Sequence, residues 1–252
     1  ERAVNCAFGG TQLRDLYLSG FGGVHVQRMK VSGVPAQPPA QWPDSMSDKP
    51  SVQVPGNVTQ LLELTYAEYG PRKMLADIFI PQRKVPLPAA FIIHGGGWIK
   101  GHKMKLRAMG VEMAKRGYVS MAIDYRLAEE APFPANIRDC HAAVRYLRAH
   151  AQKYKMDPNK IGVVGGSAGA HLAGLLATTA SVKALHGNGG NPKFSSEVQA
   201  SVVMSGPMEI STGSVAERSL TAVNPKANAI FLFGGTVKDK PELYRLADAH
   251  LH

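Results

Sequence analysis

A serine stands at the centre of a glycine-rich pentapeptide in the second half of the chain. Residues 165–169 read Gly-Gly-Ser-Ala-Gly and match G-x-S-x-G, a pattern in which a sharp strand-to-helix turn exposes the serine oxygen. The pentapeptide follows a valine-rich run and opens an Ala/Leu-rich one, which is the setting that the pattern requires. We therefore expect Ser167 to be a nucleophile rather than an idle serine in a structural turn.

A histidine followed by three glycines and a tryptophan stands upstream of that serine. Residues 94–98 read His-Gly-Gly-Gly-Trp and directly follow the apolar run 91–93, so the glycines fall at the carboxyl end of an expected strand. Glycines there can turn backbone N–H groups inward, where, with the N–H of Ala168, they would stabilise an oxyanion. A phosphate-binding turn is the alternative for this segment alone, but the chain carries neither G-x-x-x-x-G-K-[ST] nor G-x-G-x-x-G.

Strand-like and helix-like segments alternate around these two motifs. Apolar runs predict strands at 61–66, 74–80, 89–94, 118–124, 160–164 and 198–204. Helical periodicity predicts helices at 105–116, 137–154 and 168–180. The first two strands suit a β-hairpin, and the later alternation predicts an α/β fold with a mostly parallel sheet and helices on both faces. In such sheets a site forms at the carboxyl ends of the strands, where both motifs fall.

The first 60 residues differ in texture from the rest of the chain. They contain six prolines, which disfavour regular structure: Pro35, Pro38, Pro39, Pro43, Pro50 and Pro55. We expect residues 1–60 to be an irregular, Pro-rich N-terminal extension. The remaining residues, 61–252, are long enough for one domain with its own core.

Composition and charge argue against several classes of protein. Lys plus Arg number 29 against 19 Asp plus Glu, but no uninterrupted basic run of the kind typical of nucleic-acid-binding arms occurs. Residues 161–182 contain no Asp, Glu, Lys or Arg, but Gly165, Gly166 and Gly169 divide them into pieces too short for a membrane span. No secretory signal is visible after Glu1, and the compartment stays open between secreted, periplasmic and cytoplasmic. Two cysteines give no disulfide framework, and nothing indicates a metal or organic cofactor.

Four segments together resemble one known family. Residues 94–98, 124–128, 132–134 and 165–169 occur in the order found in hormone-sensitive-lipase-like esterases. The Gly-Gly-Ser-Ala-Gly form, without Asp before the serine, is similar to the bacterial acetyl-xylan and feruloyl esterase-like branch. The resemblance implies the α/β-hydrolase fold and a small-molecule ester as substrate.

The same resemblance implies roles for single residues. The N–H groups of Gly96, Gly97 and Ala168 would form the oxyanion hole. Four further residues would support the two motifs: His94, Gly95, Gly165 and Gly169. The chain departs from the family at 129–131, where Glu-Glu-Ala replaces the usual Pro-Glu-His, and this departure touches the substrate side of the site.

The acid and the base that a serine nucleophile needs are harder to place. In an α/β hydrolase they follow the serine in the order Asp or Glu, then His, on separate loops after later strands. Asp239 with His250 satisfies this order, and so do Asp248 and His252, but each pair would share one short segment instead of two loops.

The last part of the chain offers few strands that could carry such loops. We expect a strand at 229–233 and a helix from Pro241 onward. By resemblance, residues 231–236 and 241–245 are similar to the segment that precedes the acid-bearing strand in relatives. On that interpretation the acid, the base and the last strands of the sheet lie beyond residue 252.

These observations predict a serine carboxylic-ester hydrolase that acts through an acyl-enzyme on Ser167. Short-chain acyl esters, or acetyl or feruloyl esters of sugars, are the expected substrates. Two alternatives stay open: a serine peptidase of the same fold, and a ligand-binding relative that has lost its base. Peptidases resemble this chain less because they usually lack the three-glycine motif.

Overall fold

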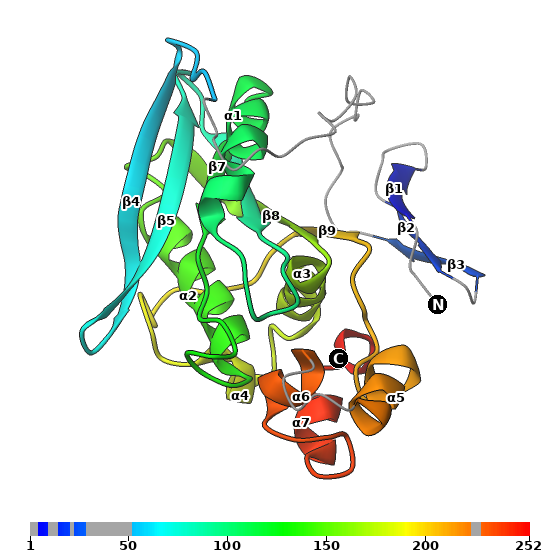
Figure 1. The fold of residues 1–252 in the computed structure, drawn as a ribbon. Coiled ribbons are helices and arrows are strands. Elements are labelled where there is room, and N and C mark those ends of the chain that lie inside the picture. The colour runs from blue at the N-terminus through cyan, green and yellow to red at the C-terminus, as the bar shows by residue number, and fades with distance from the viewer. Residues whose placement is uncertain (1–4, 10–14, 21–22, 29–51, 223–227) are drawn as a thin grey trace.

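The computed structural model describes residues 5–9, 15–20, 23–28, 52–222 and 228–252. These residues form a large mixed sheet flanked by helices and a second, small sheet built from the first strands (Figure 1).

The large sheet has six strands in the order β4-β5-β7-β6-β8-β9. Their bounds are β4 Val58–Tyr69, β5 Arg72–Pro81, β6 Leu87–Ile93, β7 Val119–Ile123, β8 Met156–Gly166 and β9 Ala200–Met204. β4 and β5 form the predicted antiparallel hairpin, and β5 pairs antiparallel with β7. The remaining three pairings are parallel, which confirms the predicted mostly parallel sheet.

The register brings the ends of four strands to one level. Ile93 at the end of β6 pairs with Ile123 of β7 and with Gly165 of β8, and Gly165 pairs in turn with Val203 of β9. The segments that follow these strands therefore meet along one edge of the sheet, as expected for a site in a parallel sheet.

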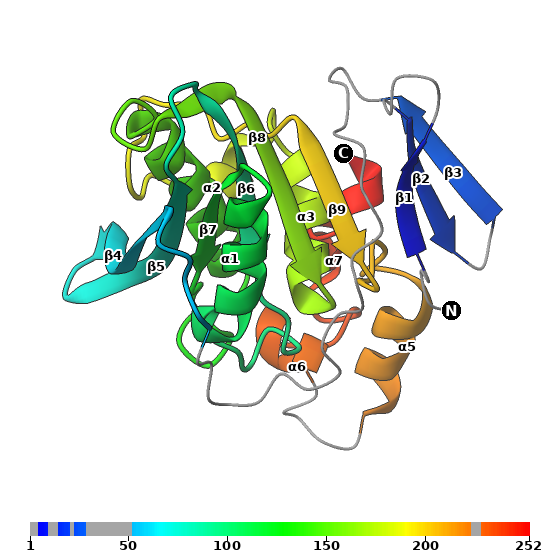
Figure 2. The ribbon, with the colours of Figure 1, turned by 90° about the horizontal axis from the view of Figure 1, so that it is seen from above.

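Helices cover both faces of the large sheet. They are η1 Lys103–Leu106, α1 Arg107–Lys115, α2 Ala135–Ala149, α3 Ala168–Thr178, α4 Lys183–His186, α5 Gly213–Thr221, α6 Asn228–Phe233, α7 Pro241–Leu246 and η2 Ala249–Leu251. α1 packs on one face, and α2 and α3 pack on the other (Figure 2). Alternation along β6 shows why: Ile92 packs in the cluster with α1, whereas Phe91 and Ile93 pack with α2 and α3.

Most of the uncharged stretch around Ser167 lies in the protein core, although Ser167 itself is exposed. It consists of the end of β8 and the whole of α3, in which every residue from Ala168 to Leu176 is buried. Such a helix is apolar all round because protein surrounds it. Among the described residues, no helix has the length and apolar character needed to cross a membrane.

The strand expected at 229–233 is wrong, because this segment is the helix α6. Its buried side chains Ala229, Leu232 and Phe233 recur at the spacing of one helix face. The Phe233 ring packs against Phe133 and Tyr244, with ring centroids 5.3 and 4.2 Å apart. The short apolar run had no periodicity long enough to separate helix from strand.

The irregular structure expected for the N-terminal extension is wrong for part of it. A three-stranded antiparallel sheet forms from β1 Asn5–Gly9, β2 Asp15–Gly20 and β3 Gly23–Arg28. None of the six prolines falls in these strands, so they do not remove a donor from the ladder. The proline-bearing residues 29–51 lie outside the described residues, and the division of the chain at residue 60 stays a prediction.

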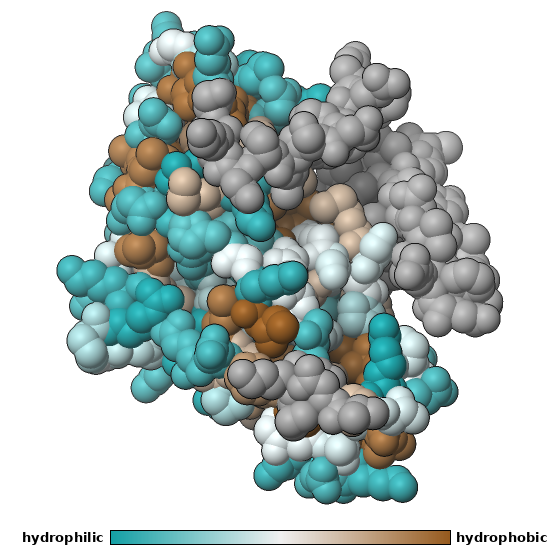
Figure 3. All heavy atoms as spheres, viewed as in Figure 1, coloured by the Kyte–Doolittle hydropathy of each residue, from teal (hydrophilic) through white to brown (hydrophobic). Residues whose placement is uncertain are grey.

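On the face shown in Figure 3, hydrophilic side chains cover most of the described surface. Apolar side chains appear there in separate small groups. Isolated apolar groups of this kind are normal for a protein surface, and they indicate no broad docking face among the described residues in this view.

Candidate active site

Ser167 occupies a sharp turn between β8 and α3. Its backbone has φ 54° and ψ −119°, a region that residues with a side chain rarely enter. Such a conformation costs about 1–3 kcal/mol and persists only when the surrounding structure holds it. The Ser167 N–H donates to Met204 O at 2.8 Å, which ties the turn to the end of β9.

Two glycines make this turn possible. A Cβ atom on Gly165 would lie 2.1 Å from the Gly169 carbonyl oxygen, and one on Gly169 would lie 2.2 Å from the Ile93 oxygen. These contacts involve backbone atoms, so a side chain at either position would force the strand and the helix apart. The structure therefore explains why glycine stands at both places.

The glycine loop after β6 lies directly against this turn. A Cβ atom on Gly95 would lie 2.7 Å from Gly166 O and 3.3 Å from the Ser167 Cβ atom. Gly96, with φ 127°, and Gly97, with φ 62°, adopt conformations that favour glycine. The two motifs, separate in sequence, thus meet at one edge of the sheet.

A pocket of about 700 Å³ opens at the serine. Its lining consists of Gly97, Trp98, Ser167, Ala168, Ser205, Gly206, Pro207, Ser214, Val215, Arg218, Ser219, Asn228 and Ala229. Ser167, Gly97 and Ala168 are brought together in this lining as expected, whereas Gly96 and His94 are not part of it. Figure 2 shows the arrowheads of β8 and β9 pointing toward α5 and α6, the helices that supply the far wall.

The contribution of α5 and α6 to the pocket was missed from the sequence. Residues 213–221 carry no motif, and 228–233 had been expected to form a strand. The buried face of α5 consists of Val215, Ala216 and Ser219, and this short pattern does not indicate proximity to Ser167.

The segment after β7 holds the glycine loop in place. The Tyr125 hydroxyl donates to His94 O at 3.1 Å, and the two rings stack with centroids 4.3 Å apart. Ala128 N–H donates to Trp98 O at 2.9 Å. Because burial is the largest influence on His94, its pKa lies below the usual value, which favours a neutral, packed ring.

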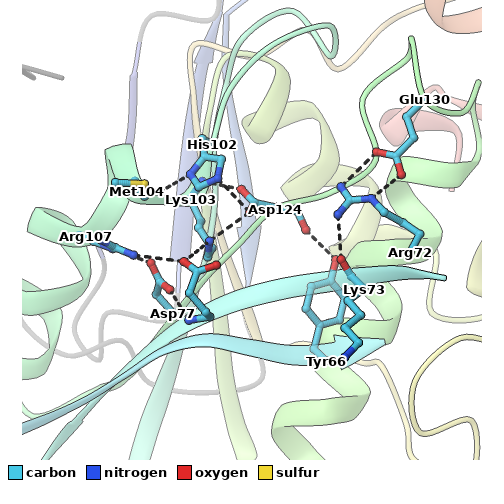
Figure 4. A network of polar contacts seen from close by, with 11 residues as sticks. Tyr66, Arg72, Lys73, Asp77, His102, Lys103, Met104, Arg107, Asp124 and Glu130 are labelled. Carbon is cyan, nitrogen blue, oxygen red and sulfur yellow. Dashed lines mark hydrogen bonds and ion pairs between the residues drawn. The ribbon is translucent and has the colours of Figure 1, made fainter. Parts of the chain in front are cut away.

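An ion-pair network around the buried Lys103 fixes the far end of that loop (Figure 4). Lys103 is fully buried, and its Nζ lies 2.8 Å from Glu63 Oε1 and 3.2 Å from Asp124 Oδ2. Asp124 Oδ1 also accepts the Lys103 backbone N–H at 2.7 Å. Burial opposes the charge of the Lys103 ammonium, but the Glu63 hydrogen bond and the charges of Asp124 and Asp77 leave its pKa above the usual value.

Arg126, in the segment after β7, has a structural role. Its Nη2 lies 2.7 Å from Oδ1 of the buried Asp139, and the guanidinium stacks 3.8 Å from the centroid of the Tyr69 ring. Burial raises the pKa of Asp139, although the hydrogen bonds and charge of Arg126 oppose that rise. The pair anchors the loop after β7 to α2.

His171 is a packed histidine rather than a base. The Trp98 indole N–H donates to its Nδ1 at 3.2 Å, so its Nε2 carries the proton and donates to Ala247 O at 2.8 Å. Burial lowers its pKa to about 4. With both nitrogens engaged, the ring is neutral and orients Trp98, which lines the pocket.

The sequence candidates for acid and base lie in contacts of their own. The exposed Asp239 accepts from Thr236 N–H and hydroxyl at 2.9 and 2.7 Å, and these bonds lower its pKa. His250 Nδ1 lies 3.3 Å from Met208 O. Neither residue is part of the described pocket lining.

Asp248 and His252, the other candidates, are likewise absent from the described pocket lining. Asp248 is buried and accepts from Ile210 N–H and from the backbone and hydroxyl of Ser211. The Nε2 atom of His252 lies 3.2 Å from Leu246 O.

Among the described residues, no group of three or more His, Cys, Asp or Glu is placed to hold a metal ion.

The strand order, the turn at Ser167 and the position of the pocket define an α/β hydrolase. More narrowly, the chain belongs to the BD-FAE family, whose model matches residues 76–252. This confirms the esterase resemblance and the α/β-hydrolase fold predicted from the four sequence segments.

Relatives and structural neighbours carry esterase names. Over 124 residues the chain is 35% identical to the probable carboxylic ester hydrolase LipM of Mycobacterium tuberculosis, covering 46% of this chain and 28% of that protein. A bifunctional GH43-CE structure of Bacteroides eggerthii has 30% identity and a TM-score of 0.65, covering 75% of this chain and 26% of that one. A truncated carbohydrate esterase from gut microbiota has 27% identity and a TM-score of 0.63, covering 76% and 71%.

Proposed function

We propose that this chain carries the nucleophile and oxyanion hole of a serine carboxylic-ester hydrolase. One observation carries the proposal: Ser167 is held at positive φ in a pocket, with the glycine loop pressed against its Cβ atom. The esterase names of the relatives support the same reaction class.

The reaction proceeds through an acyl-enzyme. Ser167 Oγ bonds to the ester carbonyl carbon as its proton passes to a base, and the carbonyl oxygen becomes an oxyanion. The N–H groups of Gly96, Gly97 and Ala168 stabilise that oxyanion; one such donor contributes about 2.7–4 kcal/mol in a well-studied case. Collapse breaks the C–O bond and releases the alcohol, which takes the proton back, and water then releases the acid.

The base is a histidine other than His171, whose two nitrogens are already engaged. His250 and His252 are the candidates that satisfy the order of the catalytic residues along the chain. Turnover that depends on Ser167 and is lost in His250→Ala would assign the base to His250. Serine-dependent turnover that survives His250→Ala would exclude it.

The substrate class is a small acyl ester, with acetyl or feruloyl esters of sugars as the preferred candidates. Carbohydrate esterases among the structural neighbours support this choice. A serine peptidase of the same fold would also hydrolyse dipeptide amides. Hydrolysis rates for an ester and an amide with the same acyl group therefore distinguish the two functions.

Hydrolysis of 4-nitrophenyl acetate tests the reaction. We expect Ser167→Ala to reduce turnover to background, because loss of the nucleophile costs about 10⁶-fold in a well-studied serine hydrolase. Ser181→Ala is the matched control, an exposed serine beyond the other end of α3, and should retain full rate. Equal rates for the wild type and Ser167→Ala would overturn the proposal and favour a ligand-binding relative.

A further inference from the structure

The pocket at Ser167 has an unbalanced charge. Among the described residues that line it, Arg218 alone carries a formal charge, and no carboxylate is part of that lining. The other side chains are small, apolar or neutral. Arg218 is exposed, so its guanidinium is accessible to a molecule that enters the pocket.

Arg218 is oriented by its own helix. Its Nε donates to Ser214 O at 2.9 Å and its Nη2 to the Ser214 hydroxyl at 3.1 Å, one turn earlier on α5. Both acceptors are neutral, and the ion pairs of the described residues include no carboxylate for this guanidinium. The Arg218 guanidinium is thus held in place by hydrogen bonds, but no carboxylate among the described residues pairs with it.

Further donors line the same pocket. The Ser214 hydroxyl accepts from Arg218, which leaves its own hydrogen free to donate. The Asn228 carboxamide lies across the glycine loop, since a Cβ atom on Gly97 would be 2.2 Å from its Nδ2. A guanidinium with neighbouring hydroxyl and amide donors is suited to a carboxylate.

We propose that the Ser167 pocket accepts esters that carry a carboxylate, and that Arg218 is the residue that selects them. The inference rests on the proposed function, and it names the substrate class for that same site. The net charge of +10 would draw such substrates toward the protein in addition.

Matched ester pairs test the inference. In the first pair, 4-acetoxybenzoate carries a carboxylate on the alcohol side of the ester, and 4-acetoxybenzamide is its neutral counterpart. In the second pair, mono-4-nitrophenyl adipate carries a carboxylate on the acyl side, and its methyl ester is neutral. We expect kcat/KM to favour the anionic member of at least one pair about tenfold, mainly through KM, because a hydrogen bond to a charged group contributes more than a neutral one.

Arg218→Gln should remove this preference, so the ratio of kcat/KM between the two members of each pair should fall to about one. Arg116→Gln is the control, because it removes the same charge from the exposed end of α1, outside the pocket. The preference should persist in Arg116→Gln and should weaken as salt is raised. An equal preference in Arg218→Gln and the wild type, or no preference in the wild type, would overturn the inference.

A binding measurement separates this inference from the proposed reaction. Calorimetry with 4-hydroxybenzoate and 4-hydroxybenzamide needs no turnover, and the anion should bind about tenfold more tightly to the wild type than to Arg218→Gln. If no ester is hydrolysed but this difference is found, the reaction fails and the carboxylate site stands. If neutral esters are hydrolysed, and neither this binding difference nor a preference for the anionic member of either ester pair is found, the reaction stands and the carboxylate site fails.

Discussion

At the scale of single residues, the backbone conformation of Ser167 depends on two neighbouring residues that have no side chain. The positive φ of the serine is enforced by the strand and helix on either side, and their close approach requires that Gly165 and Gly169 carry no side chain. Packing of the strand and the helix thus offsets the free-energy cost of the backbone conformation of Ser167.

Gly169→Ala should destabilise the protein, because the added methyl group would lie 2.2 Å from the backbone oxygen of Ile93. We expect a loss of about 1–3 kcal/mol, the usual cost of overpacking a core. Urea denaturation measures it. Gly56→Ala, where nothing lies within 4 Å, should change stability by less than about 0.5 kcal/mol. Equal effects of the two substitutions would contradict the close contact.

His171 makes stability depend on pH. Burial holds its pKa at about 4 in the fold, against about 6.5 in an unfolded chain. The unfolded state therefore binds more protons between these values, so stability is fully present above about pH 6.5 and falls as the pH drops toward 4.

His171→Gln should flatten this dependence. Gln can still accept from Trp98 and donate to Ala247, but it does not titrate. Urea denaturation at about pH 7 and at about pH 4.5 should show that the wild type loses up to about 3 kcal/mol more than the variant. Parallel pH profiles would show that His171 is not the group responsible.

At the scale of elements, the segment after β7 positions the loop after β6. Asp124, Tyr125 and Ala128 each contact a different part of the loop from His94 to Lys103. The loop that carries the proposed oxyanion donors is therefore held along its length by one neighbouring segment.

Asp124→Asn should loosen that loop. The Lys103 ammonium would keep Glu63 but lose its second carboxylate, and we expect a loss of stability of about 1–3 kcal/mol. Activity on 4-nitrophenyl acetate should show a lower kcat with little change in KM, because displaced N–H groups act on the transition state. Glu112→Gln, at an exposed pair with Lys115, should alter neither. An unchanged kcat in Asp124→Asn would refute the positioning role.

Sequence patterns predicted those elements whose periodicity is long or whose ends carry glycine. The six strands of the large sheet and the helix after Ser167 follow from apolar runs, and the meeting of the two glycine motifs follows from parallel strand ends. The contact between Trp98 and His171 could not be predicted, since it depends on how a helix and a loop pack. The N-terminal strands were missed because prolines elsewhere dominated the composition of the first 60 residues.

At the scale of the whole molecule, the core of the large sheet includes the last residues of the predicted extension as well as residues after it. The apolar clusters on both faces of the sheet begin, among the described side chains, at Val52 and Val54, which pack against Val58. A fragment from Val52 onward thus retains all of these clusters.

We expect residues 52–252 to fold without the preceding ones. Their thermal unfolding should remain cooperative, with a midpoint within a few degrees of the full chain, because a change of about 1 kcal/mol shifts it by roughly 2–4 °C at this size. Calorimetry of the two chains provides the comparison. Loss of the cooperative transition in the fragment would place residues 1–51 within the folding unit and contradict this expectation.

The bond between Trp98 and His171 also gives the pocket an optical reporter. The chain has two tryptophans, Trp98 and Trp42, so Trp42→Phe leaves one source of indole fluorescence. That indole borders the pocket and is fixed through its N–H, so a molecule that enters beside Ser167 alters the polarity around it. Occupancy can then be followed by emission wavelength, without a dye and without turnover.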